Sequence, residues 1–314
     1  MPVDLSVDLA GVRLRNPIVL AAGTCGYGAE MADVLDPRDV GAMVTKSITR
    51  ETRAGNPPWR IIDVPRGMLN AIGLANVGLD AFLAEKLAAS AQLDTVLAGS
   101  IAGASIDDYV TVAAALDARD ELPLVELNVS CPNTADGLQF GEHPDALAAL
   151  VRAVRPALGR TKLFVKLSPN VGDVVRMAAT AVEAGADGLT LINTVAAMAI
   201  DVHTRRPRLS RGAGGLSGPA IHPIAVRMVH DVHRDVTGPA GVPIIGLGGV
   251  MGWEDAAELV LAGATAVGMG TALFVDPRLP RKVARGLATW AAKQGCRSVT
   301  ELIGAVEPAG AAVP

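Results

Sequence analysis

The feature that most constrains the fold of this chain of 314 residues is a regular alternation of short apolar runs with helical segments. The apolar, β-branched runs predict eight strands, at residues 17–21, 42–46, 95–99, 124–129, 163–167, 188–193, 242–246 and 265–270. Ala- and Leu-rich segments between them predict helices at 80–92, 106–118, 144–157, 173–184, 220–234 and 253–262. Eight successive strand–helix units are typical of a closed (β/α)8 TIM barrel of the α/β class. An open doubly wound sheet is the alternative, but no GxGxxG follows the first strand, as a Rossmann domain would require.

We expect residues 1–314 to form a single domain, because α/β barrels of this length are commonly one unit. Hydrophobic residues make up 50% of the chain, enough for a large aliphatic core. Residues 49–79 are rich in Gly, Pro and Asn and are too long for an ordinary loop after a strand. They predict a lid inserted after the second strand.

Composition also excludes several classes of function. A formal charge of −4 gives no basic field for nucleic acid or for anionic membranes. No uninterrupted apolar run is long enough to span a membrane, and the N-terminus does not resemble a signal peptide, so we expect a cytoplasmic protein. Three cysteines, Cys25, Cys131 and Cys296, are too few for a disulfide framework, a zinc site or an iron–sulfur cluster. The five histidines form no metal-binding pattern, so no metal is predicted.

Polar residues and glycines gather where the predicted strands end. Barrel enzymes carry their chemistry at the carboxyl ends of the strands, where the loops converge. The residues at these ends are Thr24, Lys46, Ser47, Ser100, Asn128, Ser130, Cys131, Lys166, Ser168, Asn193, Thr194, Gly248, Gly249, Gly270 and Thr271. Because the strands are otherwise aliphatic, this concentration predicts an active site at one rim of the barrel.

The last two of these loops predict an anion site. GLGGV at 246–250 and GMGT at 268–271 are glycine-rich, and each precedes a helical segment. Glycine lets the backbone approach an anion closely, and the start of a helix offers free N–H groups. The loops after strands seven and eight are also the usual phosphate site of a barrel, although tight turns alone remain the alternative. A third cluster, GAGGLSGPA at 212–220, is expected to supply further donors.

Two lysines are predicted to point into the barrel mouth. Lys46 and Lys166 interrupt apolar strands at alternating positions, and burying an ammonium group without an anion is costly. They indicate a carboxylate, a phosphate or an electron-rich ring nearby; an ion pair with Glu126 is the alternative. The amides of Asn70, Asn128 and Asn193 both donate and accept, which suits a heterocycle bearing amide or imide groups.

Cys131 raises three alternatives: a packing residue, a metal ligand or a reactive thiol. On its own, a cysteine in an Ala-rich chain is more often a packing residue. Beside polar residues and near two lysines, its thiol pKa is expected to be lowered, which favours a proton acceptor or a nucleophile. Cys25 and Cys296 lack such neighbours and are interpreted as packing residues.

A set of motifs in this chain resembles the class 1 dihydroorotate dehydrogenases, most closely the class 1B catalytic subunit, over about residues 5 to 275. The matching blocks are NPIVLAAGTCGYG, VTKSIT, GNPPWR, GMLNAIGLANVG, ELNVSCPN, VKLSPN, LINTV, GGLSGPA, GLGGV and GMGTALF. GLGGV recurs in many phosphate-binding barrels and is a weak signal. GMLNAIGL, NVSCPN and INTV in this order are highly specific.

The resemblance implies an FMN enzyme that oxidises (S)-dihydroorotate to orotate in the synthesis of pyrimidines. Cys131 would take the proton from C5 of the substrate while a hydride leaves C6 for flavin N5. The substrate would be held by Lys46, Asn70, Ala71, Ile72, Gly73, Leu74, Asn128, Asn193 and Thr194. FMN would be held by Ala22, Lys46, Ser47, Ser100, Asn128, Lys166, Ile192, Gly218, Gly248, Gly249, Gly270 and Thr271. Two residues depart from the family pattern: Ala22 stands where Ser is common, and Ser100 where Asn is common.

The subclass determines the electron acceptor. TRRPRL followed by GGLSGPA resembles class 1B, in which a second subunit with FAD and a [2Fe-2S] cluster passes electrons to NAD. This implies a homodimer, or a heterotetramer with that subunit. The alternatives are a fumarate-reducing homodimer of class 1A and a flavin reductase acting on pyrimidines or tRNA uridines. A barrel that binds a phosphate ligand without catalysis is a further alternative. The class 2 dihydroorotate dehydrogenases are disfavoured, because their N-terminal membrane segment and serine base are not found in this sequence.

Overall fold

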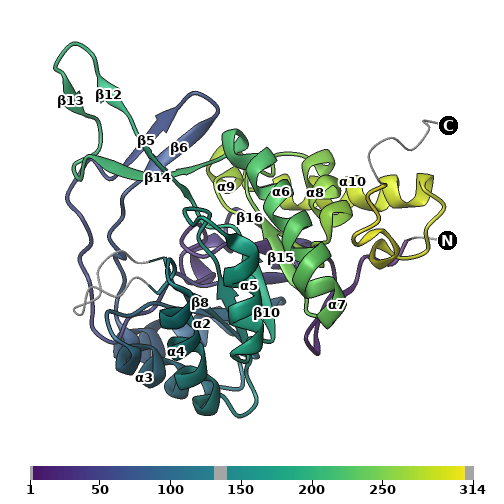
Figure 1. Ribbon diagram of the computed structural model, residues 1–314, viewed down its shortest axis with the longest axis horizontal. Coiled ribbons are helices and arrows are strands. Elements are labelled where there is room, and N and C mark those ends of the chain that lie inside the picture. The colour runs from purple at the N-terminus through teal and green to yellow at the C-terminus, as the bar shows by residue number, and fades with distance from the viewer. Residues whose placement is uncertain (1–2, 131–139, 308–314) are drawn as a thin grey trace.

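The computed structural model describes residues 3–130 and 140–307 as a closed barrel of eight parallel strands, flanked by helices (Figure 1). The predicted TIM barrel is therefore confirmed, and each predicted strand overlaps one observed strand, with bounds that differ by a few residues. The barrel strands are β3 (Ile18–Leu20), β4 (Ala42–Val44), β7 (Val96–Ile101), β8 (Leu124–Asn128), β9 (Lys162–Lys166), β10 (Gly188–Leu191), β15 (Ile244–Leu247) and β16 (Ala266–Met269). Their order around the barrel is β10-β15-β16-β3-β4-β7-β8-β9.

Helices surround the barrel, and the six predicted ones are all found. The α-helices are α1 (Leu79–Ala81), α2 (Leu87–Ser90), α3 (Ile106–Asp117), α4 (Pro144–Val154), α5 (Val174–Glu183), α6 (His222–Val232), α7 (Gly238–Ala240), α8 (Trp253–Ala262), α9 (Ala272–Val275) and α10 (Leu279–Lys293). The shorter 3-10 and π-helical turns are η1 (Ala29–Met31), η2 (Pro37–Asp39), η3 (Phe82–Lys86), η4 (Arg155–Ala157), η5 (Pro219–Ile221), η6 (His233–Thr237) and η7 (Val299–Leu302).

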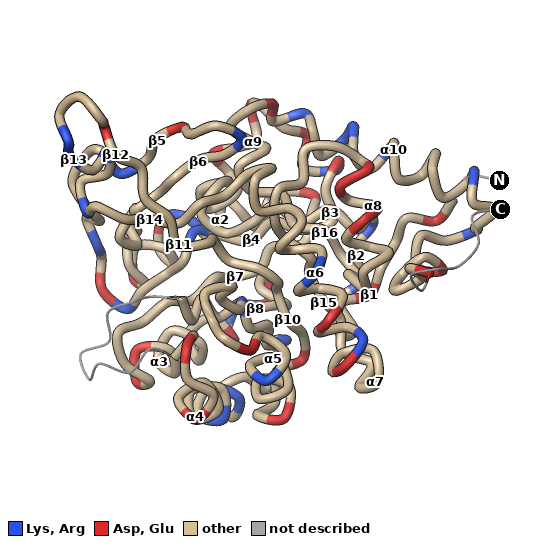
Figure 2. Tube along the Cα trace, turned by 45° about the horizontal axis from the view of Figure 1, so that its top comes forward, with Lys and Arg blue, Asp and Glu red and all other residues tan. Residues whose placement is uncertain are grey.

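Local capping explains where several helices begin. The Ser105 hydroxyl accepts from the N–H of Asp108, and the Asp108 carboxylate accepts in return from the N–H of Ser105, so α3 starts with a capping box. The Asp173 carboxylate caps α5 by accepting from the N–H of Arg176. On the outer surface, α4 and α5 carry both acidic and basic residues (Figure 2). This mixture agrees with the small net charge of −4.

A second sheet stands at the edge of the barrel mouth, on the left of Figure 1. It is antiparallel, in the order β11-β14-β6-β5, and is built from β5 (Ile61–Val64), β6 (Gly67–Asn70), β11 (Val195–Met198) and β14 (Ala213–Ser217). A hairpin of β12 (Ile200–Asp201) and β13 (Arg206–Pro207) extends it. Residues 49–79 therefore contribute two strands, which pair with a second insertion after β10. We call these four strands the cover sheet.

Most of the glycine cluster at 212–220 forms β14, so the donors expected of it stay a prediction that now centres on Gly218, directly after the strand. A Cβ on Gly214 would lie 2.4 Å from the carbonyl oxygen of Asn70, and one on Gly215 would lie 2.0 Å from Thr194 Oγ1. These glycines allow close backbone approach within the cover sheet. Of the cluster, Ser217 and Gly218 lie nearest the end of β14 and the start of η5.

The core is aliphatic and continuous between barrel and helices. Its few aromatic residues include Tyr109, Phe82 and Phe164, which are fully buried. An N-terminal hairpin of β1 (Val7–Leu9) and β2 (Val12–Leu14) adds two buried leucines to this core. Within the described residues, no helix is both long and apolar enough to cross a membrane.

Gly188 in β10 provides a test of barrel packing. A Cβ at this position would lie 2.3 Å from the ring of Phe164, so we expect Gly188→Ala to lower the free energy of unfolding by about 1–3 kcal/mol. Urea unfolding at equilibrium measures the change. Gly172→Ala is the matched control, because nothing lies within 4 Å of a Cβ there. Equal stabilities of the two variants would contradict the packing described here.

Candidate active site

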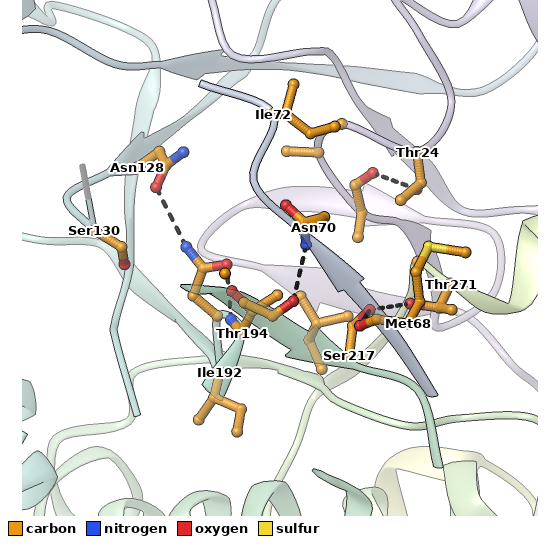
Figure 3. Close-up of a pocket in the computed structure, with 18 of the residues that line it drawn as sticks. Thr24, Met68, Asn70, Ile72, Asn128, Ser130, Ile192, Thr194, Ser217 and Thr271 are labelled. Atoms are coloured by element: carbon orange, nitrogen blue, oxygen red, sulfur yellow. Dashed lines mark hydrogen bonds between the residues drawn. The ribbon is translucent and has the colours of Figure 1, made fainter. Parts of the chain in front are cut away.

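A cavity of about 810 Å³ lies at the carboxyl ends of the barrel strands, with the cover sheet along one side (Figure 3). Its wall includes residues that follow β3, β4, β8, β9, β10, β15 and β16. The cover sheet adds residues such as Met68, Asn70 and Ser217. The barrel therefore brings together side chains that are far apart in the sequence.

Nearly all the sequence-predicted site residues that the structure describes line this cavity. They are Ala22, Lys46, Ser47, Asn70, Ala71, Ile72, Gly73, Leu74, Asn128, Lys166, Ile192, Asn193, Thr194, Gly218, Gly248, Gly249, Gly270 and Thr271. Ser100 does not line it: its side chain is fully buried, and its hydroxyl lies 2.9 Å from that of Ser47. Cys131 lies outside the described residues. The roles assigned to these residues stay predictions.

A chain of side-chain hydrogen bonds connects four strand ends. Ser47 lines the cavity, and its hydroxyl contacts that of Ser100, which lies farther from the cavity. Asn128 Nδ2 donates a hydrogen bond to Ser47 Oγ at 3.2 Å. Asn193 Nδ2 donates to Asn128 Oδ1 at 3.4 Å, and the N–H of Thr194 donates to Asn193 Oδ1 at 2.9 Å. The two asparagine amides are thus oriented before any ligand binds, which is the condition for selective recognition of a polar ring.

The two predicted lysines both reach the cavity, but their partners differ. Lys166 Nζ lies 3.9 Å from Glu126 Oε1, and both side chains are buried. Glu126 Oε2 accepts a hydrogen bond from Thr190 at 2.7 Å. Lys166 therefore lines the cavity and also faces Glu126, as the alternative interpretation anticipated. Lys46 makes no ion pair with any described residue.

The pKa of Lys46 is lowered from its ordinary value of 10.5, first by burial and then by repulsion from Lys166 and Arg60. Two ammonium groups thus line the cavity, and only that of Lys166 faces the buried carboxylate of Glu126. Unbalanced buried charge of this kind favours an anion, since an anionic ligand would restore the lost interactions with water.

The opposite part of the cavity offers backbone donors. Within the described residues, the N–H groups of Gly218, Gly248, Gly249, Gly270 and Thr271 have no hydrogen-bond partner. Thr271 also donates its hydroxyl hydrogen to Ser217 Oγ at 2.7 Å. Gly218 and Gly249 have φ of 94° and 72°, in the left-handed region that favours glycine. Unpaired backbone N–H groups along a cavity wall are suited to bind an anion, as the glycine-rich loops predict.

The segment 70–74 is held from behind by the rest of the lid. Asn56 Nδ2 donates to the carbonyl of Ala71 at 2.8 Å, and Asn76 Nδ2 donates to the carbonyl of Leu74 at 2.7 Å. Asn76 also accepts from the N–H groups of Thr49 and Gly78. Leu74 has φ of 56°, a conformation that non-glycine residues rarely adopt. Such constrained backbone is typical of functional loops.

Sequence reasoning missed several residues that line the cavity. They include Arg53, Asn56, Met68, Asn170, Arg211 and Ser217. Asn170 follows β9 in the VKLSPN block, which was a usable signal; it bridges the carbonyl of Thr194 at 3.0 Å and the N–H of Ala196 at 2.8 Å. Arg211 donates to Asn56 Oδ1 at 3.1 Å, a contact between the two insertions that no local pattern indicates.

Comparison with known proteins agrees with this geometry. The sequence profile of the family described as dihydroorotate dehydrogenase matches residues 4–290. The chain belongs to the dihydroorotate dehydrogenase family. The resemblance predicted from the motifs is therefore confirmed, and the family assignment makes the chain an oxidoreductase.

Dihydroorotate dehydrogenases similar to this chain come from several bacteria. The relative from Geotalea daltonii is 49% identical over 305 residues, which cover 97% of this chain and 98% of the relative. The relative from Trichlorobacter lovleyi is 47% identical, with 98% and 100% covered, and that from Bacteroides thetaiotaomicron is 44% identical, with 97% and 99% covered. Each is named dihydroorotate dehydrogenase B (NAD(+)), catalytic subunit.

Enzymes of this family bind FMN, and the residues present here fit that cofactor. The unpaired N–H groups of the loops after β15 and β16 suit a phosphate. The ammonium group of Lys166 and the oriented amide of Asn128 lie in the same cavity and suit a polar ring. Among the described residues, no three His, Cys, Asp or Glu side chains gather as metal ligands.

Lys46→Met should raise the free energy of unfolding of the flavin-free dehydrogenase at pH 7, because it removes a partly buried ammonium group that has no ion-pair partner among the described residues. Folding lowers the pKa of Lys46, so the penalty is complete below the folded-state pKa and fades as pH rises toward 10.5. The gain in stability should therefore shrink between pH 7 and about pH 10 in urea titrations. Lys293→Met, at an exposed position, is the control. A variant no more stable than the wild type at pH 7 would contradict the electrostatics described.

Proposed function

We propose that this chain oxidises (S)-dihydroorotate to orotate, with FMN as cofactor, in the de novo synthesis of pyrimidines. The observation that carries the proposal is the division of the cavity into two parts. One part holds two ammonium groups and oriented asparagine amides, and the other holds unpaired backbone N–H groups. Relatives named for this reaction align over nearly the whole chain, which supports the same conclusion.

The proposed binding of FMN uses residues from several strand ends. The N–H groups of Gly218, Gly248, Gly249, Gly270 and Thr271 would bind the phosphate. Lys166, Lys46, Ser47 and Asn128 would contact the ring, with Ala22 and Ile192 packing beside it. Ser100 would act through Ser47, because their hydroxyl groups are in contact. FMN supplies the hydride acceptor, and a cation such as Lys166 would stabilise the negative charge that develops there.

The proposed substrate contacts follow from the charge and the amides. The ammonium of Lys46 would bind the substrate carboxylate, which would also relieve its own unfavourable burial. The segment 70–74, Asn128, Asn193 and Thr194 would bind the amide and imide edges of the ring. Cys131 is proposed as the base that removes the C5 proton while the C6 hydride leaves. This role derives from the sequence resemblance, since Cys131 lies outside the described residues.

We also propose that residues 1–314 act as a single FMN-binding domain, with 49–79 as its lid. The cover sheet supports this, because β6 of the lid pairs with β14 and lines the cavity. In that position the lid would exclude water from hydride transfer, which is the function usually assigned to such covers.

The electron acceptor is proposed to be NAD, through a separate subunit that carries FAD and a [2Fe-2S] cluster. The relatives are named NAD(+)-linked catalytic subunits, which supports this over fumarate reduction of the class 1A type. We propose a homodimer that assembles with that subunit into a heterotetramer, in the cytoplasm. A flavin reductase of pyrimidines is the remaining alternative, and no observation favours it.

The proposed activity has a direct test. Purified protein should be yellow, and dihydroorotate should bleach its flavin absorbance under anaerobic conditions with formation of orotate. Dihydrouracil, which lacks the carboxylate, should reduce the flavin far more slowly, because it cannot pair with Lys46. Reoxidation is then followed with fumarate and with NAD, with and without the electron-transfer subunit. A colourless protein, or one that forms no orotate, would refute the proposal.

Cys131→Ala should retain flavin but reduce it with dihydroorotate about 10²- to 10⁴-fold more slowly, because the proton acceptor is lost. Stopped-flow absorbance measures the rate of flavin reduction. Cys131→Ser is the matched variant: it preserves size and supplies a weaker base, so its rate should fall between the two. Reduction of Cys131→Ala at the wild-type rate would show that another group removes the proton.

A further inference from the structure

His222 joins the loop after β15 to helix α8, and the function proposed above makes no use of it. It is the first residue of α6 and is buried, with 8% of its surface exposed. Its Nδ1 lies 2.7 Å from the carbonyl oxygen of Gly248, and its Nε2 lies 2.9 Å from Glu258 Oε2. The ring therefore bridges two segments that the barrel places side by side.

The contact with Gly248 controls the direction of the next N–H group. A carbonyl oxygen only accepts, so Nδ1 is the donor. The peptide bond between Gly248 and Gly249 is trans, and in a trans peptide the C=O and N–H vectors point in opposite directions. Turning the Gly248 carbonyl toward His222 thus turns the Gly249 N–H away from it. Both glycines line the cavity, and this N–H has no partner within the described residues.

Two successive glycines would not hold this orientation by themselves. Gly248 has φ of 150° and Gly249 has φ of 72°, and glycine moves readily among such conformations. A Cβ on Gly249 would lie 2.7 Å from the Cβ of His222 and 2.9 Å from the carbonyl oxygen of Gly218. The loop is therefore packed directly on the start of α6. The imidazole supplies the one side-chain hydrogen bond to the Gly248 carbonyl among the described residues.

The second contact holds the other edge of the ring. Nε2 lies 2.9 Å from Glu258 Oε2 on α8, so the imidazole is fixed from two sides. The Asp255 carboxylate is the other acidic group that faces it, at 3.9 Å. The ring is thus held between the carboxylates of α8 and the loop that contains Gly248 and Gly249.

We propose that His222 is a positioning residue for the phosphate of FMN: it holds the Gly248 carbonyl so that the Gly249 N–H faces the phosphate. This inference rests on the FMN binding proposed above. A purely structural role for His222, linking α6 to α8, would have a different effect. Its loss would destabilise the fold and so weaken the binding of every ligand equally.

The test compares two ligands that differ only in the phosphate. Affinities of flavin-free protein for FMN and for riboflavin are measured by quenching of flavin fluorescence. His222→Ala should weaken FMN about 10- to 100-fold, the loss expected for a charge-assisted hydrogen bond, and leave riboflavin unchanged. Equal losses for both ligands, or no loss for FMN, would overturn the proposal.

A matched pair of variants separates the two contacts of the ring and does not depend on His222→Ala folding. The amide nitrogen of Asn can replace Nδ1, whereas that of Gln can replace Nε2. His222→Asn should therefore keep most of the FMN affinity, and His222→Gln should lose it. Glu258→Gln changes only the partner of Nε2 and leaves the Nδ1 contact, so its loss of FMN affinity should be smaller than that of His222→Gln. Equal FMN affinities of the Asn and Gln variants would overturn the proposal.

Inorganic phosphate distinguishes this inference from the proposed function. Thermal unfolding of the flavin-free protein is followed with added phosphate, and the wild type and His222→Asn should be stabilised more than His222→Gln. If the wild type bound phosphate but not FMN, the proposed function would fail. The stabilisation of His222→Asn by phosphate, compared with that of His222→Gln, would still decide the role of His222. A wild type that bound neither would overturn both.

Discussion

The structure depends on two lysines held close together in the barrel mouth, Lys166 buried against Glu126 and Lys46 partly buried without an ion-pair partner among the described residues. Removing an ammonium group from water is costly unless an opposite charge replaces the lost hydration. This cost falls on Lys46, whose pKa is lowered as a result. The large aliphatic core allows the fold to tolerate this penalty. A stable barrel thus holds a cavity in which an anion would find Lys46 without a competing ion pair among the described residues.

Much of the barrel could be predicted because its parallel strands are buried on both faces. Such strands appear in sequence as continuous apolar runs, and the residues that follow them must meet at one end of the barrel. Lys46, Asn128 and Gly248 could therefore be assigned to one cavity without knowledge of the loops. Ser100 shows the limit of this argument. Its place at the end of β7 was right, but Ser47 lies between it and the cavity.

The cover sheet could not be predicted, for a physical reason. Its strands are short and partly exposed, and they pair across more than a hundred residues of intervening sequence. Gly214 and Gly215 were interpreted as anion donors because glycine clusters serve both loops and close sheet packing, and composition does not distinguish the two. His222 was missed because its importance lies in a carbonyl of another loop. A side chain that acts on a distant peptide group leaves no local pattern.

The pairing of β6 with β14 has a consequence for how ligands enter and leave. Asn70, at the end of β6, donates to the carbonyl of Gly215 at 3.3 Å, and Arg211 reaches Asn56 in the other insertion. The two insertions are thus joined by the backbone hydrogen bonds between β6 and β14 and by these two side-chain hydrogen bonds. Opening the cover sheet over one insertion alone would therefore break this pairing, so any widening of the cavity on this side would have to move both insertions together.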